Sequence, residues 1–213
     1  MTGVTAADTG LETTDLQKRF KYHHGNLRES LIDAALDILK TEGVAGLSLR
    51  HLAKVTGVTP AAPYSHFRDK DDLLATIAES GFQKLALQMV EDATGVHTTQ
   101  ARVEKLITSY IRFAENNTPL FRLMFGAEVS DMKKYPTLAM TAGKSYALIS
   151  SALSARTPSD MVDTRFLTVT IWSLCHGLAS LVIDERLNPA AFGAASLDAF
   201  VQKTVGAFSQ HLA

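Results

Sequence analysis

Apolar residues recur every three or four positions along most of the chain, which is the spacing of amphipathic helices. The pattern is clearest between residues 26 and 89, where glycine, proline and helix-capping residues divide it into short segments. It returns in longer segments up to residue 212, and no segment alternates apolar and polar residues as a half-buried strand does. We therefore predict an all-α fold with about nine helices.

Residues that favour helix ends set the expected boundaries in the first third of the chain. Asn26, Ser48 and Asp69 each precede a periodic stretch and can cap it by accepting a hydrogen bond from a first-turn backbone N–H. Gly43 and Gly57 are placed to end two of these helices. Farther along, helices are predicted at residues 103–114, 119–127, 136–155, 166–183 and 197–212.

The segment 48–67 has the spacing of a helix-turn-helix. Ala53 is small enough for the next helix to cross it closely, and Gly57 supplies the positive φ of the turn. Thr59 and Pro60 predict the cap and first position of a third helix. Pro63 falls inside that helix and lacks a backbone N–H, so we expect its first turn to be tight and 3₁₀-like.

Composition divides the chain into three parts. Residues 1–25 hold few large apolar side chains and end in basic residues, which predicts a flexible arm. Residues 26–70 hold the three short helices, and residues 71–213 hold most of the large apolar side chains. The formal net charge is −1, yet residues 18–70 contain nine Lys/Arg against five Asp/Glu. A basic N-terminal third favours a polyanionic partner, although chance clustering is the alternative.

Several classes of protein are disfavoured by the sequence. The single cysteine, Cys175, allows no intrachain disulfide. Residues 1–10 lack the features of a secretory signal, and we find no uncharged apolar run of about 18 residues, so a cytoplasmic protein without a membrane-spanning helix is expected. Cys175 and His176 are helix neighbours that point about 100° apart, and no phosphate loop, nucleophile elbow or His–Glu metal spacing occurs. We expect no enzyme, metal or cofactor.

Specific motifs fall in register between residues 20 and 80. They are Tyr-His-His-Gly-Asn-Leu-Arg (22–28), Ala-Ala (34–35), Gly43, Leu-Ala (52–53), Thr-Gly-Val-Thr (56–59), Tyr-Ser-His-Phe (64–67), Lys70 and Leu-Leu (73–74). Together they resemble the DNA-binding domain of the tetracycline repressor (TetR/AcrR) family. The segment Trp-Ser-Leu-Cys-His-Gly-Leu (172–178) also resembles a Trp-His-Gly segment in the ligand-binding domain of one branch of that family.

The resemblance implies which residues meet DNA. They lie at the start of the second helix and along the recognition helix: Ser48, Arg50, Thr59, Ala61, Ala62, Tyr64, Ser65, His66 and Lys70. Ser48, Arg50 and Lys70 would contact phosphates. Alternatives remain for three of these residues: Tyr64 as a packing ring, His66 as a solvated or capping side chain, and Arg50 as an ordinary surface charge.

The C-terminal part carries candidates for an apolar ligand pocket. Methionine and aromatic side chains suit an adaptable pocket with few polar groups. The candidates are Tyr110, Phe113, Phe121, Met124, Phe125, Tyr146, Trp172 and His176. At helical spacing such residues also form ordinary cores. His176, four residues after Trp172, is either a donor that orients a ligand or a hydrogen-bonded core histidine.

The resemblance further implies a homodimer, formed by helices at about 163–184 and 196–212. In that reading the protein is a repressor that binds a palindromic DNA operator as a dimer and is released by a small apolar or amphipathic effector. A ligand-independent architectural DNA-binding protein is the alternative. The 71–213 region is larger than dimerisation alone requires, which argues for the ligand-binding form.

Overall fold

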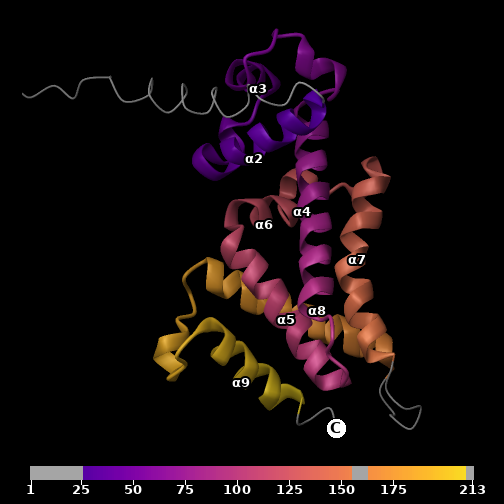
Figure 1. Cartoon of the computed structure of the whole chain (residues 1–213), viewed down its shortest axis with the longest axis vertical. Helices are drawn as coiled ribbons and strands as arrows, with labels where there is room; N and C mark the ends of the chain where they lie inside the picture. The colour runs from indigo at the N-terminus through magenta and orange to yellow at the C-terminus, as the bar shows by residue number, and fades with distance from the viewer. Residues whose placement is uncertain (1–25, 155–162, 210–213) are drawn as a thin grey trace, which may run out of the picture.

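The computed structural model describes residues 26–154 and 163–209, which form eight α-helices and no strand (Figure 1). The all-α prediction is confirmed. The predicted arm at 1–25, the end of the helix expected to reach residue 155, and Leu212 of the final helix lie outside these residues.

The N-terminal helices form a small unit at one end of the molecule, which we call the head. It contains α2 (Leu27–Gly46), α3 (Leu49–Thr56) and a 3₁₀ helix, η1 (Ala62–Ser65). The long helix α4 (Lys70–Asp92) leaves the head and runs down the molecule beside α7 (Figure 1).

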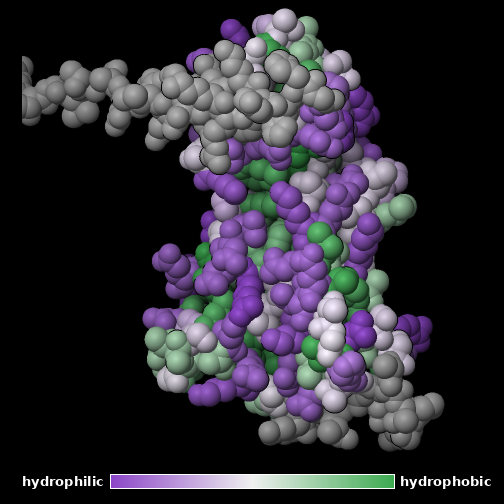
Figure 2. Space-filling model, in the orientation of Figure 1, coloured by the Kyte–Doolittle hydropathy of each residue, from purple (hydrophilic) through white to green (hydrophobic). Residues whose placement is uncertain are grey.

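The remaining helices form the body. They are α5 (Thr99–Asn116), α6 (Thr118–Met124), α7 (Pro136–Leu153), α8 (Thr164–Ile183) and α9 (Leu197–Ser209), with 3₁₀ turns at Ala127–Val129, Met132–Lys134 and Pro189–Phe192. α5 packs against α4, α7, α8 and α9, so it lies at the centre of the body. Buried apolar side chains form one cluster that continues from α2 to α9. Figure 2 shows a band of hydrophobic surface below the head, between α2 and the α4–α6 region.

The predicted caps are present in the head. The side chains of Asn26, Ser48 and Asp69 accept hydrogen bonds from the backbone N–H groups of the third residue after each of them, at 3.5, 3.1 and 2.8 Å. Gly57 adopts the left-handed conformation (φ 70°) that ends α3. At Gly43 the helix is only interrupted: this residue has φ 70° and ψ −171°, and helical structure resumes as far as Gly46.

One glycine lets two helices approach each other closely. A Cβ atom at Gly81, near the middle of α4, would lie 2.6 Å from Met124 Sδ and 3.1 Å from Leu120 Cδ1. The bare backbone at Gly81 therefore provides the space in which α6 crosses α4.

The apolar helix α8 differs from the sequence expectation. By length and composition it could cross a membrane, with a mean hydropathy of 1.8 over a window that is 33% buried. The expectation that no uncharged apolar run reaches about 18 residues is therefore wrong. Threonine, serine and the neutral His176 interrupt the run in α8 without adding a charge to it. Length and composition do not place α8 in a membrane, since a helix packed within a globular protein passes the same test.

Candidate DNA-binding surface and effector site

The turn between α3 and η1 is held by short-range backbone hydrogen bonds. The Gly57 N–H donates to Lys54 O at 3.4 Å, and the Val58 N–H donates to Ala53 O at 3.1 Å. No atom lies within 4 Å of a Cβ built on Gly57, so its positive φ, not crowding, is what requires glycine there. This turn fixes the direction in which residues 59–66 leave α3.

The expected third α-helix is instead a 3₁₀ helix. Its hydrogen bonds span three residues: Ala62 N–H to Thr59 O at 3.0 Å, Tyr64 N–H to Ala61 O at 3.1 Å, and His66 N–H to Pro63 O at 3.0 Å. Pro63 cannot donate to Thr59 O, so that carbonyl accepts from Ala62 instead. Thr59 makes no side-chain cap, contrary to the prediction, because the 3₁₀ helix begins three residues later. The 3₁₀ geometry, which the sequence predicted for the first turn of this helix, extends over all of η1.

The 3₁₀ helix presents short and polar residues to solvent. Pro63 and Phe67 are buried beneath it, whereas Tyr64 has 58% of its side chain exposed. Thr59, Ala61 and Ser65 are also exposed, and Ala62 and His66 are half-buried. Neither the Tyr64 hydroxyl nor the His66 imidazole hydrogen-bonds to another described residue. Both polar groups are therefore free to meet an external partner.

A shallow depression lies between α3 and the turn. Its lining includes Ser48, Arg50, Lys54 and Pro60. Arg50 and Lys54 are exposed, and the Arg50 guanidinium forms no ion pair with the described residues. His51, which also lines it, is hydrogen-bonded to Glu42 at 3.1 Å. The depression therefore combines the unpaired guanidinium of Arg50 with the N-terminus of α3, the features that suit a phosphate.

Lys70 lies differently from the other predicted contacts. Its ammonium donates to the carbonyl of Val44, in the last turn of α2, at 2.9 Å. The sequence did not reveal this contact, which joins residues 26 positions apart. An ammonium group has three donors, so it can bind this carbonyl and a phosphate together.

Most of the predicted ligand-binding side chains meet in the body, in a group that we call the aromatic cluster. At its centre, His176 Nδ1 lies 3.0 Å from the Tyr110 hydroxyl. The centroid of the His176 ring lies 4.6 Å from the ring centroid of Phe125, 5.5 Å from that of Phe121 and 6.2 Å from that of Trp172. Tyr146 joins through an edge-on contact with Trp172, at 6.4 Å.

Two predicted members lie outside this ring network, and one member was missed. Phe113 is buried in the core without a ring contact in the cluster, and Met124 packs against Gly81 of α4. Phe82 of α4 packs edge-on against Phe125 at 5.2 Å. The spacing of apolar residues along α4 indicates only that Phe82 is buried, because no pattern within one helix shows which ring of another helix it will meet.

Burial controls the protonation of the cluster. It lowers the pKa of His176, which favours the neutral ring. Burial also raises the pKa of Tyr110, with a smaller contribution from Cys175 and an opposing one from Trp172, so the phenol is a neutral hydroxyl. The pKa of the Cys175 thiol is raised by burial to about 12, which makes it a poor nucleophile. Within residues 26–154 and 163–209, no three His, Cys, Asp or Glu residues gather as a metal site.

Comparison with known proteins identifies both parts of the chain. The family described as bacterial regulatory proteins, tetR family, matches residues 31–77, and the tetracyclin repressor-like C-terminal domain matches residues 103–208. A solved structure of a protein with unknown function from Rhodococcus sp. RHA1 is 32% identical, covers 91% of this chain and 98% of its own, and superposes with a TM-score of 0.77. The chain belongs to the TetR family.

More distant TetR-like structures share the fold. A putative TetR-family transcriptional regulator from Rhodococcus sp. is 18% identical, with a TM-score of 0.67 over 87% of this chain and 97% of its own. FadR from Bacillus subtilis, solved in complex with stearoyl-CoA, is 16% identical, with a TM-score of 0.64 over 82% of this chain and 93% of its own. The two family matches, over residues 31–77 and 103–208, make this TetR-family chain a transcriptional regulator with a helix-turn-helix head.

Proposed function

We propose that this regulator is a repressor that binds a palindromic operator as a homodimer and is released by a small apolar or amphipathic effector. The observation that carries the proposal is the exposed η1 face, where Tyr64 and His66 have free polar groups beside the depression that holds Arg50. In this proposal residues 26–70 bind DNA, and residues 71–213 bind the effector and form the dimer.

The η1 face favours close approach to a major groove. Thr59, Ala61 and Ala62 have small side chains, so the backbone of the 3₁₀ helix can come near the base edges. Few long hydrogen-bonding side chains are present there, so most of the affinity comes from phosphates and falls as salt concentration rises. Ser48, Arg50 and Lys70 supply phosphate contacts, whereas Tyr64, Ser65 and His66 lie nearer the groove.

An apolar face of α8 supports the dimer. Five exposed residues recur at helical spacing on one side of α8, and we call them the α8 stripe: Phe166, Val169, Ser173, Gly177 and Leu181. Phe166 is 73% exposed, Val169 47% and Leu181 43%, and the small Ser173 and Gly177 between them allow a close helix contact. The α8 stripe, together with α9, is the surface that we assign to the second copy. A two-fold dimer presents its recognition elements about 34–36 Å apart, one turn of DNA.

The aromatic cluster supports an effector site with one polar handle. The Tyr110 phenol is the better donor, so we assign its proton to the hydrogen bond with His176 Nδ1 and the ring proton of His176 to Nε2. Nε2 makes no hydrogen bond to another described residue. It therefore offers one N–H among apolar rings, a chemistry that suits an amphipathic molecule. The stearoyl-CoA held by the structurally similar FadR is amphipathic too.

Operator binding and release test the two halves of the proposal separately. Fluorescence anisotropy with the DNA that flanks the protein's own gene should show saturable, salt-sensitive binding, weakened by Tyr64→Ala and by His66→Ala. Leu87→Ala, at an exposed site on α4, is the matched control and should bind as the wild type does. Normal operator affinity in both head variants would remove Tyr64 and His66 from the interface.

A panel of amphipathic compounds, added to the protein–operator complex, tests the effector site. A compound that releases the wild type should release His176→Phe poorly, because the variant keeps the ring but loses the N–H. Operator affinity without the compound should not change. Equal release of both proteins would show that His176 does not contact the effector.

A further inference from the structure

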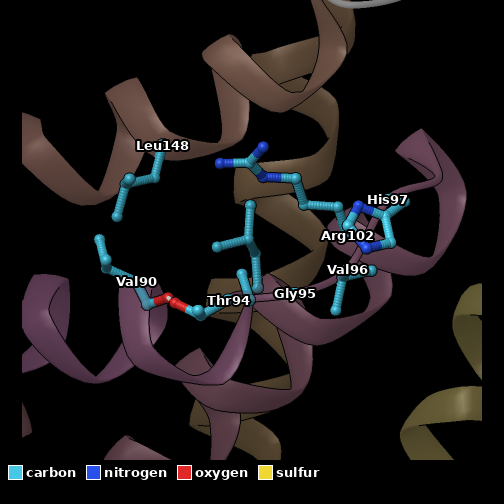
Figure 3. Close-up of a pocket in the computed structure, with 9 residues that line it drawn as sticks. Val90, Thr94, Gly95, Val96, His97, Arg102 and Leu148 are labelled. Carbon is cyan, nitrogen blue, oxygen red and sulfur yellow. Dashed lines mark hydrogen bonds between the residues drawn. The ribbon is translucent and has the colours of Figure 1, made fainter.

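A second pocket lies at the far end of α4 from the head, at the turn into α5. We call it the turn pocket, and its volume is about 190 Å³ (Figure 3). Val90 and Thr94 come from the end of α4 and the turn, Arg102 and Leu106 from α5, and Leu148 from α7. In Figure 3 the Arg102 side chain extends from the His97 side of the pocket toward Leu148. None of its lining residues belongs to the aromatic cluster.

The turn pocket combines an apolar wall with unpaired nitrogen groups. Val90 is 48% exposed although it lines a hollow, Leu148 is half-buried and Leu106 is 1% exposed. Neither Arg102 nor His97 makes a side-chain hydrogen bond or ion pair with the described residues. The Thr94 hydroxyl already donates to the Val90 carbonyl at 2.8 Å, so Arg102 and His97 are the available side-chain donors.

We propose that the turn pocket binds a small monocarboxylate with a short apolar tail. The planar Arg102 guanidinium can pair with both oxygens of a carboxylate, and His97 can add a third hydrogen bond. The tail covers Val90, Leu106 and Leu148. A volume of about 190 Å³ is below that of pockets for drug-sized ligands, which start at about 300 Å³, and fits a short acid.

The charges around the pocket favour one negative charge over two. Glu91 and Asp92 are exposed at the end of α4, next to the turn, but neither lines the pocket. They oppose the binding of a dianion such as phosphate more strongly than that of a monocarboxylate. The apolar wall adds an attraction that phosphate cannot use.

Titration with sodium hexanoate, followed by NMR of backbone amides and Val/Leu methyl groups in the full chain, tests the proposal. Saturable shifts are expected at Val90, Leu106 and Leu148. Hexan-1-ol lacks the charge and inorganic phosphate lacks the tail, so both should bind at least about tenfold more weakly at equal ionic strength. Shifts confined to Tyr110, Trp172 and His176 would place the acid in the aromatic cluster and overturn the assignment.

Variants separate the pocket from general charge. Arg102→Gln should weaken hexanoate binding at least about tenfold, and Arg102→Lys should retain part of it. Val90→Glu puts a competing carboxylate beside Arg102 and should abolish binding. Lys105→Gln removes a positive charge from the same helix outside the lining and should bind as the wild type does.

Undiminished binding by Arg102→Gln, equal binding of hexan-1-ol or phosphate, or no saturation with hexanoate would each overturn the proposal. Thermal melts should show that every variant is folded.

Discussion

The η1 face of the head and the α8 stripe of the body are both exposed, but they expose different chemistry. On η1 the apolar Pro63 and Phe67 point inward, and the exposed residues are short or polar apart from the amphipathic Tyr64. On α8 the arrangement is reversed, because Phe166, Val169 and Leu181 are left outside. The Cys175 face points inward.

This difference in exposed chemistry is consistent with the two partners that we propose, DNA for the head and a second copy of the chain for α8. A duplex offers phosphates and polar base edges, so a protein face that binds it needs small side chains and free hydrogen-bonding groups. A second copy of the chain offers an apolar face of its own, and burying two such faces is favourable in proportion to their area. We therefore expect substitutions on α8 to act on assembly and those in the head to act on DNA binding or head stability.

The largest expected effect is on assembly. Phe166→Asp combined with Leu181→Asp places four like charges in a two-fold interface, so the protein should become a monomer. Its operator affinity should then fall by about 100-fold or more, because the two half-sites are no longer linked. Light scattering after gel filtration and fluorescence anisotropy measure the two effects.

Leu87→Asp controls for a charge at an exposed apolar site, since Leu87 is 60% exposed on α4 and lies outside the stripe. It should leave the dimer intact. If the double variant remained dimeric, α8 would not be the interface.

The next largest effect concerns the turn of the head. Gly57→Ala forces a residue with a Cβ into φ 70° and should lower the free energy of unfolding by about 1–2 kcal/mol. Gly143→Ala is the matched control: Gly143 is exposed within α7 with no atom within 4 Å of its Cβ position, so alanine should stabilise by about 0.5–1 kcal/mol. Urea unfolding measures both. Stabilisation by both substitutions would contradict the strained turn.

Lys70 permits a finer separation of structure from DNA contact. Lys70→Ala removes the hydrogen bond to the Val44 carbonyl and should lower the free energy of unfolding by about 1 kcal/mol. If Lys70 also binds a phosphate, the slope of log affinity against log salt should decrease in magnitude by about 1. Lys84→Ala, an exposed lysine farther along α4, should change neither quantity. A stability loss with an unchanged salt slope would make Lys70 a tether only.

The smallest effect is the pH dependence that His176 adds. Its pKa is lower in the folded than in the unfolded chain, so below about pH 6.5 the unfolded state binds more protons. Its contribution to stability is therefore fully present above that pH and is lost as the pH falls from the unfolded pKa through the lower folded pKa. In His176→Gln, the free energy of unfolding should change less between about pH 7 and pH 5 than it does in the wild type. His66→Gln controls for the loss of one imidazole, and an unchanged slope in His176→Gln would contradict the assignment.

Local features of the head were predictable because each depends on neighbouring residues. The caps at Asn26, Ser48 and Asp69 and the turn at Gly57 follow from residues three or four positions apart. The form of the third helix was predicted only in part: a tight first turn was expected at Pro63, but the whole element is a 3₁₀ helix. Pro60 fits the first turn of an α-helix, but Pro63 removes a further N–H, and the short segment that remains makes one bond of α-helical span, from the Phe67 N–H to Pro63 O at 2.9 Å.

Features that join distant parts of the chain were only partly predictable. Aromatic and methionine composition marked a set of rings, and Tyr110, Phe121, Phe125 and His176 do meet. That set could not show that Phe113 stays apart from the ring network, because the position of a ring depends on how helices cross. The turn pocket was also missed, since it draws on α4, α5 and α7 and its residues form no motif.

The glycine at the crossing of α4 and α6 has a mechanical consequence. α4 has 23 residues, so it is a rod about 34 Å long, and Gly81 lies at its halfway point. If a rigid rod of this length rotates by about 5° around its centre, each end moves by roughly 1.5 Å, in opposite directions. One end of this rod borders the turn pocket and the other carries Lys70, which is attached to the head. For a rigid α4 that turned about this crossing, a displacement at the pocket end would appear at the head with similar amplitude and opposite sign.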